Sequence, residues 1–224
     1  MCGRYTIIVS MEELMLRYLA DWPAGPHQPR YNVAPMQDVL AVIHDGEKNR
    51  LGPLRWGLVP AWADDDKIGS RMINARAETL LQKPAFKPLI ARKRALIPAD
   101  GFYEWKTVGG RKQPMRITMK DGGVFSFAAL YDTWTSPEGK KIHTCTIITT
   151  TPNSLVAGIH DRMPVILRRE DESVWLSRSN RDAERLMSLL QPYPAEAMRA
   201  YPVSPQVGNV KNDTESCIEE IGVR

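Results

Sequence analysis

Short runs of β-branched and apolar residues, divided by glycine, proline and aspartate, constrain the fold of this chain more than any other feature of its sequence. Thr144–Thr150 and Val39–Ile43 are typical of strands. Met115–Lys120 and Val124–Tyr131 flank Asp121-Gly122-Gly123, which predicts a β-hairpin. The runs do not alternate regularly with helical segments, so a parallel doubly wound sheet is not expected. We therefore predict an α+β fold built mainly on antiparallel or mixed β-sheet.

A few helices and long loops complete the predicted secondary structure. Residues 11–20 follow a capping box that starts at Ser10, and their apolar side chains recur at helical spacing, which predicts an amphipathic helix. The same spacing predicts a helix over 182–190, and 75–82 is expected to form a short one. Residues 21–35 are expected to form an irregular loop, and the proline-rich stretch 192–208 to wrap the surface. No linker or repeat divides the chain, so residues 1–224 are predicted to form one domain.

The composition is that of a globular protein with a substantial core. Hydrophobic residues make up 43% of the 224 positions and charged residues 25%, which argues against a disordered chain. No run of 18 apolar residues and no secretory signal is visible, so we expect a cytoplasmic protein with no membrane contact. The three cysteines, at positions 2, 145 and 217, have no CxxC spacing. They predict neither a disulfide framework nor a metal site, and no cofactor is expected.

Basic residues are concentrated in one part of the chain. The segment from Lys83 to Lys120 holds ten lysines and arginines against the two acids Asp100 and Glu104, an excess of +8, whereas the whole chain carries +4. Such clustering is typical of a protein that binds a polyanion such as nucleic acid. A solvated basic face with no partner is the alternative interpretation.

Cys2 is the first residue whose reactive groups suggest a function. Removal of Met1 would leave Cys2 with a free amine and a thiol on neighbouring carbons. The amine can condense with an aldehyde to an imine, and the thiol can then close a five-membered thiazolidine. The pKa is ordinarily about 8 for the amine and about 8.5 for the thiol, so reactive forms of both groups are expected at neutral pH. The alternative is that a cysteine stands at position 2 by chance.

Three further segments combine polar groups that suit chemistry on nucleic acid. Asn74 and Arg76 offer an amide and a planar guanidinium, although Asn74 can equally cap a helix. Glu104 lies among aromatic residues, a setting that raises a carboxyl pKa and favours acid–base catalysis, and Trp105 can stack on a base. Core packing is the alternative for this segment.

The third segment holds His160 and Arg162 between two apolar runs. His160 can move protons near neutral pH, and Arg162 can contact a phosphate. A structural histidine that makes its hydrogen bonds inside the fold is the alternative interpretation.

Taken together, these segments resemble the SOS-response-associated peptidase family, also called the SRAP domain, and the resemblance covers nearly the whole chain. Six strings match in order and spacing: Met-Cys-Gly-Arg-Tyr at 1–5, Tyr-Asn-Val-Ala-Pro at 31–35, Arg-Trp-Gly-Leu-Val-Pro-Ala-Trp at 55–62, Ile-Asn-Ala-Arg-Ala-Glu-Thr at 73–79, Pro-Ala-Asp-Gly-Phe-Tyr-Glu-Trp-Lys at 98–106, and His-Asp-Arg-Met-Pro-Val at 160–165. No position that carries function in the family departs from its pattern.

The resemblance implies a compact, mostly β, barrel-like SRAP fold with a positive cleft for single-stranded DNA. It implies that mature Cys2 forms a covalent thiazolidine crosslink with the ring-opened sugar of an abasic site. Separately, we expect the protein to be a monomer. It also implies an autoproteolytic activity that removes residues before Cys2. Carried over position by position, the site residues are Cys2, Asn74, Glu104 and His160 at the crosslink, Arg4, Arg76 and Arg162 at phosphates, Trp105 and Thr149 lining the site, and Pro35 and Trp62 in the DNA cleft.

Two other functions remain open on the sequence. A peptidase of the N-terminal-nucleophile type would use Cys2 to attack an amide, with Glu104 or His160 as the base. A non-covalent reader of modified DNA bases would use the aromatic and basic residues and make no use of the aminothiol. A purely structural protein would leave the polar segments unexplained.

Overall fold

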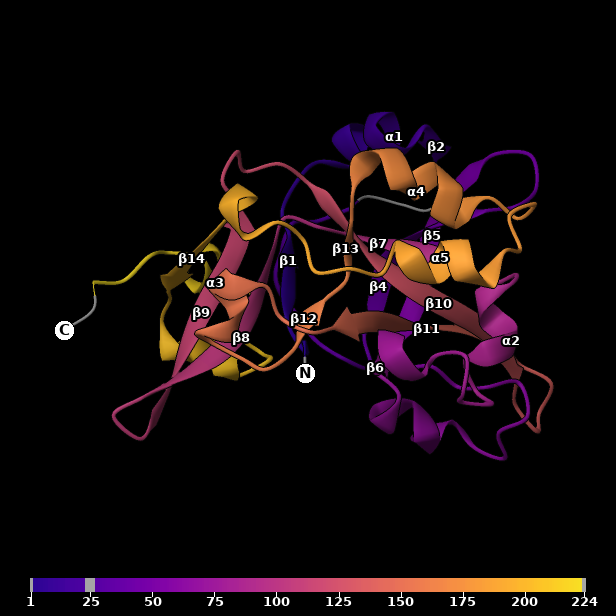
Figure 1. Cartoon of the computed structure of the whole chain (residues 1–224). Coiled ribbons are helices and arrows are strands. Elements are labelled where there is room, and N and C mark those ends of the chain that lie inside the picture. The colour runs from indigo at the N-terminus through magenta and orange to yellow at the C-terminus, as the bar shows by residue number, and fades with distance from the viewer. Residues whose placement is uncertain (1, 23–26, 223–224) are drawn as a thin grey trace.

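The computed structural model describes residues 2–22 and 27–222, and its strands form two sheets that pack against each other. The first sheet has five strands in the order β14-β9-β8-β1-β3, all antiparallel. Figure 1 shows this sheet at the left of the view. Its strands are β1 (Tyr5–Ile7), β3 (Arg30–Val33), β8 (Gly101–Val108), β9 (Arg111–Met119) and β14 (Met198–Pro202).

The second sheet closes into a barrel. Its path runs from β11 through β10, β7 and β4 to β5, and β5 pairs in parallel with β11, so five strands form a ring. The barrel strands are β4 (Asp38–His44), β5 (Asn49–Trp56), β7 (Arg94–Ala99), β10 (Phe125–Thr135) and β11 (Lys141–Thr150). Four shorter strands join this sheet: β2 (Ala20–Asp21), β6 (Asn74–Arg76), β12 (Met163–Pro164) and β13 (Ile166–Leu167). The closed ring confirms the predicted barrel-like α+β fold.

Short helices cover the barrel and connect its strands. Figure 1 shows α1 beside α4, and an ion pair joins them because Arg17 Nη2 lies 2.7 Å from Glu172 Oε1. The α-helices are α1 (Met11–Tyr18), α2 (Lys87–Ile90), α3 (Ser154–Ala157), α4 (Arg169–Leu176) and α5 (Ala183–Ser188). The 3-10 helices are η1 (Asp66–Arg71), η2 (Ala77–Thr79), η3 (Ala195–Ala197), η4 (Pro205–Gly208) and η5 (Glu215–Cys217). None of the helices within the described residues has the length and apolar character needed to cross a membrane.

One hydrophobic core joins the two sheets. Tyr5 of the first sheet contacts Phe127 of the barrel edge-to-face, with ring centroids 5.8 Å apart, and also packs at 5.6 Å on Trp56. Phe102 reaches the same Phe127 at 6.1 Å. Aromatic pairs in these geometries stabilise a fold beyond the area that they bury. The start of β1 and the adjoining part of β8 are therefore anchored firmly, which matters because Cys2 and Glu104 lie beside these anchors.

Several local predictions are confirmed. The Ser10 hydroxyl caps α1 by accepting a hydrogen bond from the Glu13 N–H, and Asp182 caps α5 in the same way. The predicted strands at 39–43 and 144–150 lie within β4 and β11. These signals depend on residues close together in the chain, which explains their success.

The predicted hairpin around Gly122 is wrong, although the turn and both strands exist. Gly122 has a φ of 72°, yet β9 pairs with β8 and β14 whereas β10 pairs with β7, β11 and β13. The turn therefore carries the chain from one sheet to the other. The strands that do pair across a glycine turn are β8 and β9, where Gly109 and Gly110 both have positive φ.

Three more segments differ from their predictions because strand pairing overrides local propensity. Residues 74–76 form β6 on the edge of β11, and only one 3-10 turn follows, so no α-helix spans 75–82. The predicted loop 21–35 contains β3, and its residues 23–26 lie outside the described residues. The predicted surface segment 192–208 contains β14, which pairs with β9 along five residues.

A buried ion pair fastens β1, β8, β9 and β14 together at Gly101. Arg116 donates to Asp100 Oδ1 and to Thr6 Oγ1, each at 3.0 Å, and to the Tyr201 hydroxyl at 2.6 Å. A Cβ on Gly101 would lie 2.8 Å from Arg116 Nε and 2.9 Å from Thr6 Oγ1. The glycine is therefore required by the close approach of these side chains.

We expect Gly101→Ala to lower the free energy of unfolding by about 3 kcal/mol, because the added methyl group both overpacks the site and disturbs a buried ion pair. Gly52→Ala is the matched control, since a Cβ there meets no atom within 4 Å. Urea denaturation followed by circular dichroism measures both. Equal stability of the two variants would contradict the packing argument.

Candidate active site

Strand pairing places Cys2 beside Glu104. In the antiparallel pair of β1 and β8, Tyr5 lies opposite Phe102, and the Tyr103 N–H donates to the Arg4 carbonyl at 3.0 Å. The same register, continued outward, brings residues 2 and 3 alongside Glu104 and Trp105. Cys2 is fully buried there, although its sequence position gave no hint of burial.

The Glu104 carboxyl is buried and incompletely hydrogen-bonded. Its side chain is 2% exposed, and Oε1 has no hydrogen-bond partner in the described part of the chain. Burial raises the pKa of Glu104 to about 8, and the nearby charge of Asp161 adds to the effect. The carboxyl is therefore protonated at neutral pH and can act as an acid. The predicted setting of Glu104 in an apolar environment is present in the structure.

His160 faces Glu104 from the segment that follows α3. Its Nε2 lies 3.9 Å from Glu104 Oε2. The Arg162 backbone N–H donates to Nδ1 at 3.0 Å, which leaves the proton of the neutral ring on Nε2, toward Glu104. Burial lowers the pKa of His160, while Asp161, whose Oδ1 lies 3.1 Å from Nδ1, acts in the opposite direction. The ring is thus neutral at pH 7 and positioned for proton exchange with the carboxyl.

The ionisation of the Cys2 thiol in the structure differs from the prediction. Burial raises the pKa of this thiol far above its ordinary value, and Glu104 adds to the effect, while a hydrogen bond from the Arg4 backbone opposes it. This direction runs against the expectation of a reactive thiolate at neutral pH. A neighbouring base must take the thiol proton as the sulfur reacts.

Asn74 lies in a strand instead of capping a helix. It sits in β6 opposite Ile147 of β11, and its Nδ2 donates to the carbonyls of Ile73 at 3.1 Å and Ile147 at 3.4 Å. These bonds fix the orientation of the amide. Its Oδ1 is buried and accepts no hydrogen bond within the described residues, so it is available to a ligand donor.

Arg76 and Arg162 lie on either side of Thr149, but only one of them is paired. Thr149 is buried in β11, opposite Arg76 of β6 and Pro164 of β12. Arg162 donates to both carboxylate oxygens of Glu78, at 2.8 and 2.9 Å, and to the Thr149 carbonyl at 2.8 Å. The guanidinium of Arg76 is exposed and forms no hydrogen bond or ion pair with the described residues. Of these two arginines, Arg76 is the one available to an anion.

Arg4 is engaged inside the protein. Its guanidinium donates to the carbonyls of Val207 at 2.6 Å and Gly208 at 3.0 Å, and to Asn32 Oδ1 at 2.9 Å. The Asn32 amide donates to Val207 and to two further carbonyls of the same segment. The structural role of Asn32 was not foreseen, because its partners lie more than 170 positions away.

The remaining predicted residues lie at the surface or partly buried. Trp62 is 64% exposed, and Pro35 is half-buried in a loop whose next residue, Met36, donates to the Trp56 carbonyl. Trp105 is half-buried and packs against a small cluster around Tyr103. Among the described residues, no hydrogen bond or ion pair joins Pro35 or Trp62 to Glu104, so their part in a DNA cleft stays a prediction.

The basic segment is not one surface. Arg116 is buried in the ion pair with Asp100, and Arg94 is buried with its guanidinium donating to carbonyls such as that of Trp175. Lys93 is paired with Asp132 at 2.6 Å. Lys106, Arg111 and Lys112 are exposed at the β8–β9 turn. The excess of +8 therefore overstates the positive surface that the segment provides.

The fold and the site together define a class: a β-barrel protein with a buried cysteine beside a protonated carboxyl and a neutral imidazole. The sequence profile of the family described as SOS response associated peptidase (SRAP) matches residues 1–210. The chain belongs to this family.

Individual relatives match over nearly their whole length. The abasic site processing protein YoqW of Bacillus subtilis (strain 168) is 52% identical over 222 residues, which cover 98% of this chain and 99% of that protein. YoaM of the same organism, also named an abasic site processing protein, is 50% identical over 222 residues, 98% of each chain. The crystal structure of a protein from Bacteroides thetaiotaomicron superposes with a TM-score of 0.89 at 30% identity, and covers 98% of this chain and 100% of the other.

Proposed function

We propose that this protein processes abasic sites by forming a covalent thiazolidine between mature Cys2 and the ring-opened sugar in single-stranded DNA. The names of its relatives support abasic-site processing. The observation that carries the chemistry is the Glu104 carboxyl, buried beside Cys2 and 3.9 Å from His160, with its pKa raised to about 8. An acid of that strength near neutral pH suits both the loss of water and the return of a proton.

The first half of the proposed reaction makes an imine. After removal of Met1, the Cys2 amine attacks the sugar aldehyde, and a proton moves from nitrogen to oxygen to give a carbinolamine. Protonated Glu104 then donates its proton to the departing hydroxyl, which leaves as water. The products are an iminium ion and a Glu104 carboxylate. His160 exchanges protons with this pair and assists the opening of the sugar ring.

The second half closes the thiazolidine. The Cys2 sulfur attacks the iminium carbon as the Glu104 carboxylate takes the thiol proton, which restores the carboxylic acid. This step explains how a thiol with a raised pKa can react. The Glu104 carboxylate formed in the first half of the reaction is the base that removes the thiol proton. The overall reaction joins an amine, a thiol and an aldehyde with loss of one water, and it consumes no cofactor. The ring closure is intramolecular, so positioning supplies much of its advantage.

The surrounding residues are proposed to hold the substrate. The free Asn74 Oδ1 accepts a hydrogen bond from the adduct, and Thr149 and Trp105 line its surroundings. Arg76 binds a neighbouring phosphate directly. Arg162 reaches a phosphate only by leaving Glu78, and Arg4 acts by ordering the chain around Cys2. Pro35 and Trp62 contact the strand farther along. We propose a monomer acting in the cytoplasm.

Intact-mass spectrometry tests the proposed function. After incubation with an abasic oligonucleotide, the protein should lack Met1 and gain the mass of the oligonucleotide less one water. An oligonucleotide whose abasic aldehyde has been reduced to an alcohol is the control and should give no adduct. An adduct of equal yield with the reduced oligonucleotide, or none with either, would refute the proposal.

Replacement of Arg76 should weaken the initial non-covalent binding. We expect Arg76→Ala to reduce the slope of log affinity against log salt by about 0.7, the value for one phosphate of a single strand. Arg92→Ala, which removes an exposed base near α2, is the control and should leave the slope unchanged. Fluorescence anisotropy with intact single-stranded DNA measures both. An unchanged slope in Arg76→Ala would show that this guanidinium contacts no phosphate.

A further inference from the structure

Glu78 holds the place of an anion at one of the arginines of the candidate site. It lies in η2, two positions after Arg76 of β6. Both of its carboxylate oxygens accept from Arg162, Oε1 from Nη1 at 2.8 Å and Oε2 from Nη2 at 2.9 Å. A guanidinium holds a phosphate in the same bidentate geometry. The carboxylate therefore covers an edge of Arg162 that a phosphodiester would use.

The rest of the Arg162 guanidinium offers no second place for a phosphate. Nη2 also donates to the Thr149 carbonyl at 2.8 Å, and Nε is buried without a hydrogen-bond partner in the described part of the chain. An arriving anion cannot reach the edge that Nε forms, because that atom is closed to solvent. A phosphate can therefore bind Arg162 in the bidentate manner only where the Glu78 carboxylate now lies.

Glu78 is charged at neutral pH and acts on two cations. The hydrogen bonds from Arg162 lower the pKa of Glu78, and the charge of Arg76 adds to the effect. The side chain of Glu78 is 45% exposed. The carboxylate thus cancels one of the two positive charges that these arginines would otherwise present to a DNA strand.

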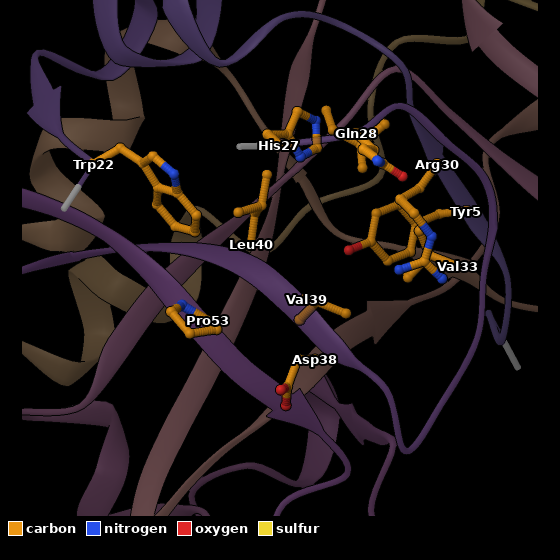
Figure 2. Close-up of a pocket in the computed structure, with 11 residues that line it drawn as sticks. Tyr5, Trp22, His27, Gln28, Arg30, Val33, Asp38, Val39, Leu40 and Pro53 are labelled. Carbon is orange, nitrogen blue, oxygen red and sulfur yellow. The ribbon is translucent and has the colours of Figure 1, made fainter. Parts of the chain in front are cut away.

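The position of Glu78 differs from that of a carboxylate that fastens the fold. Arg30, which lines a hollow shown in Figure 2, is paired with Asp213. Asp213 also accepts from the backbone N–H groups of Tyr31 and Asn32, so it ties the C-terminal segment to β3. Within the described residues, no backbone N–H of another element donates to Glu78. Since an exposed ion pair contributes little to stability, this carboxylate can turn away at small cost.

We propose that Glu78 is a built-in competitor for the DNA phosphate at Arg162 and that a bound strand displaces it. This inference rests on the proposed function, because it takes the phosphodiester of single-stranded DNA as the incoming anion. The exchange replaces one singly charged anion by another, and the contact of Arg162 with Thr149 is kept. In the free protein the pair reduces the attraction for any polyanion, and Arg162 is released only to a strand that is seated in the site.

Glu78→Gln tests the competition, because glutamine has the same shape and no charge. Its binding to intact single-stranded DNA should be tighter by about fivefold at about 0.1 M salt. That factor is the effect of one more neutralised phosphate, which steepens the slope of log affinity against log salt by about 0.7. Fluorescence anisotropy measures both quantities. A residue that only held Arg162 in position would give the opposite result, weaker binding and a shallower slope.

Glu47→Gln is the matched control. It removes an equal charge from the exposed turn between β4 and β5 and should leave both affinity and slope unchanged. Glu78→Ala is the second variant, and it should give the same gain even if the glutamine amide still accepts a hydrogen bond from Arg162.

A double-mutant cycle separates release of Arg162 from a general effect of charge. In the Arg162→Ala background, Glu78→Gln should change DNA affinity by less than about twofold, because no guanidinium remains to be released. Arg162→Gln serves in its place if the alanine variant does not fold by circular dichroism. A gain of the same size in both backgrounds would assign the effect to the strand or to Arg76 and overturn the proposal.

The proposal is equally overturned if neither Glu78 variant binds more tightly than the unaltered protein. Failure of the proposed function has a different signature, namely no adduct with the abasic oligonucleotide. The two failures are distinguishable, because binding of intact DNA is measured without any covalent step.

Discussion

Replacement of Cys2 by alanine is expected to abolish the covalent adduct with abasic single-stranded DNA, a loss of at least a hundredfold in yield. The alanine retains the N-terminal amine, so an imine can still form, but it cannot be closed to a thiazolidine and hydrolyses during denaturation. Denaturing gel electrophoresis after incubation with an abasic oligonucleotide measures the loss. Non-covalent binding to intact DNA should stay within a factor of two, because Cys2 is buried and contributes no charge.

Two comparisons make the Cys2 result specific. Cys2→Ser should give an adduct only when borohydride reduces the imine, because the hydroxyl closes the ring less readily than the thiol. Cys145→Ala removes another fully buried cysteine and should crosslink normally if it folds. An undiminished adduct in Cys2→Ala, stable to denaturation, would refute the role assigned to the sulfur. Peptide cleavage with no DNA present, lost in Cys2→Ala, would favour the peptidase alternative.

Glu104→Gln is expected to slow crosslinking by about 10²- to 10⁴-fold, the usual contribution of a positioned acid or base. The rate for the unaltered protein should fall as the pH rises through about 8, where Glu104 loses the proton that it donates. The glutamine variant should lack this fall. Single-turnover rates between pH 6 and 9.5 measure the effect, and a rate within threefold of the unaltered protein at pH 7 would exclude Glu104 as the acid.

The same substitution makes a prediction about stability with a definite sign. The folded pKa of Glu104 is raised from 4.5 to about 8, so folding retains a proton that the unfolded chain releases. The stabilising effect of that proton is complete below pH 4.5 and is lost as the pH rises through about 8. Glutamine cannot ionise, so the variant should gain stability relative to the unaltered protein as the pH rises from 5 to 9. Urea denaturation at both values tests this, and a variant that fails to fold would support a purely structural carboxyl.

What the sequence could predict depended on how near in the chain the partners lie. The Ser10 cap, the helix at α1 and the strand β11 depend on neighbouring residues, and they were predicted correctly. The turn at Gly122 was also recognised, but its two strands pair with others that are distant in the chain, so the hairpin was wrong. Residues 75–82 were predicted to form a helix because the strand that pairs with residues 74–76, β11, begins 65 residues after Arg76.

The same limit applies to the candidate site. Residue types and motifs pointed to Cys2, Glu104 and His160, and the structure brings Glu104 within 3.9 Å of His160 and into electrostatic contact with Cys2. The sequence could not predict the protonation state of each group, because burial sets the pKa values. Nor could it predict which arginines are already paired, because their acceptors lie far away in the chain. Arg162 is held by Glu78, 84 positions away, and nothing in the order of residues indicates that pair.

The bond between Arg4 and Val207 spans 203 positions and bears on how the protein is made. A chain still emerging from the ribosome carries Cys2 long before residues 207 and 208 exist to order its surroundings. During that interval the hydrogen bonds that hold Arg4 beside Cys2 cannot form. On the proposed mechanism, the aminothiol thus gains its ordered surroundings only when translation has almost finished.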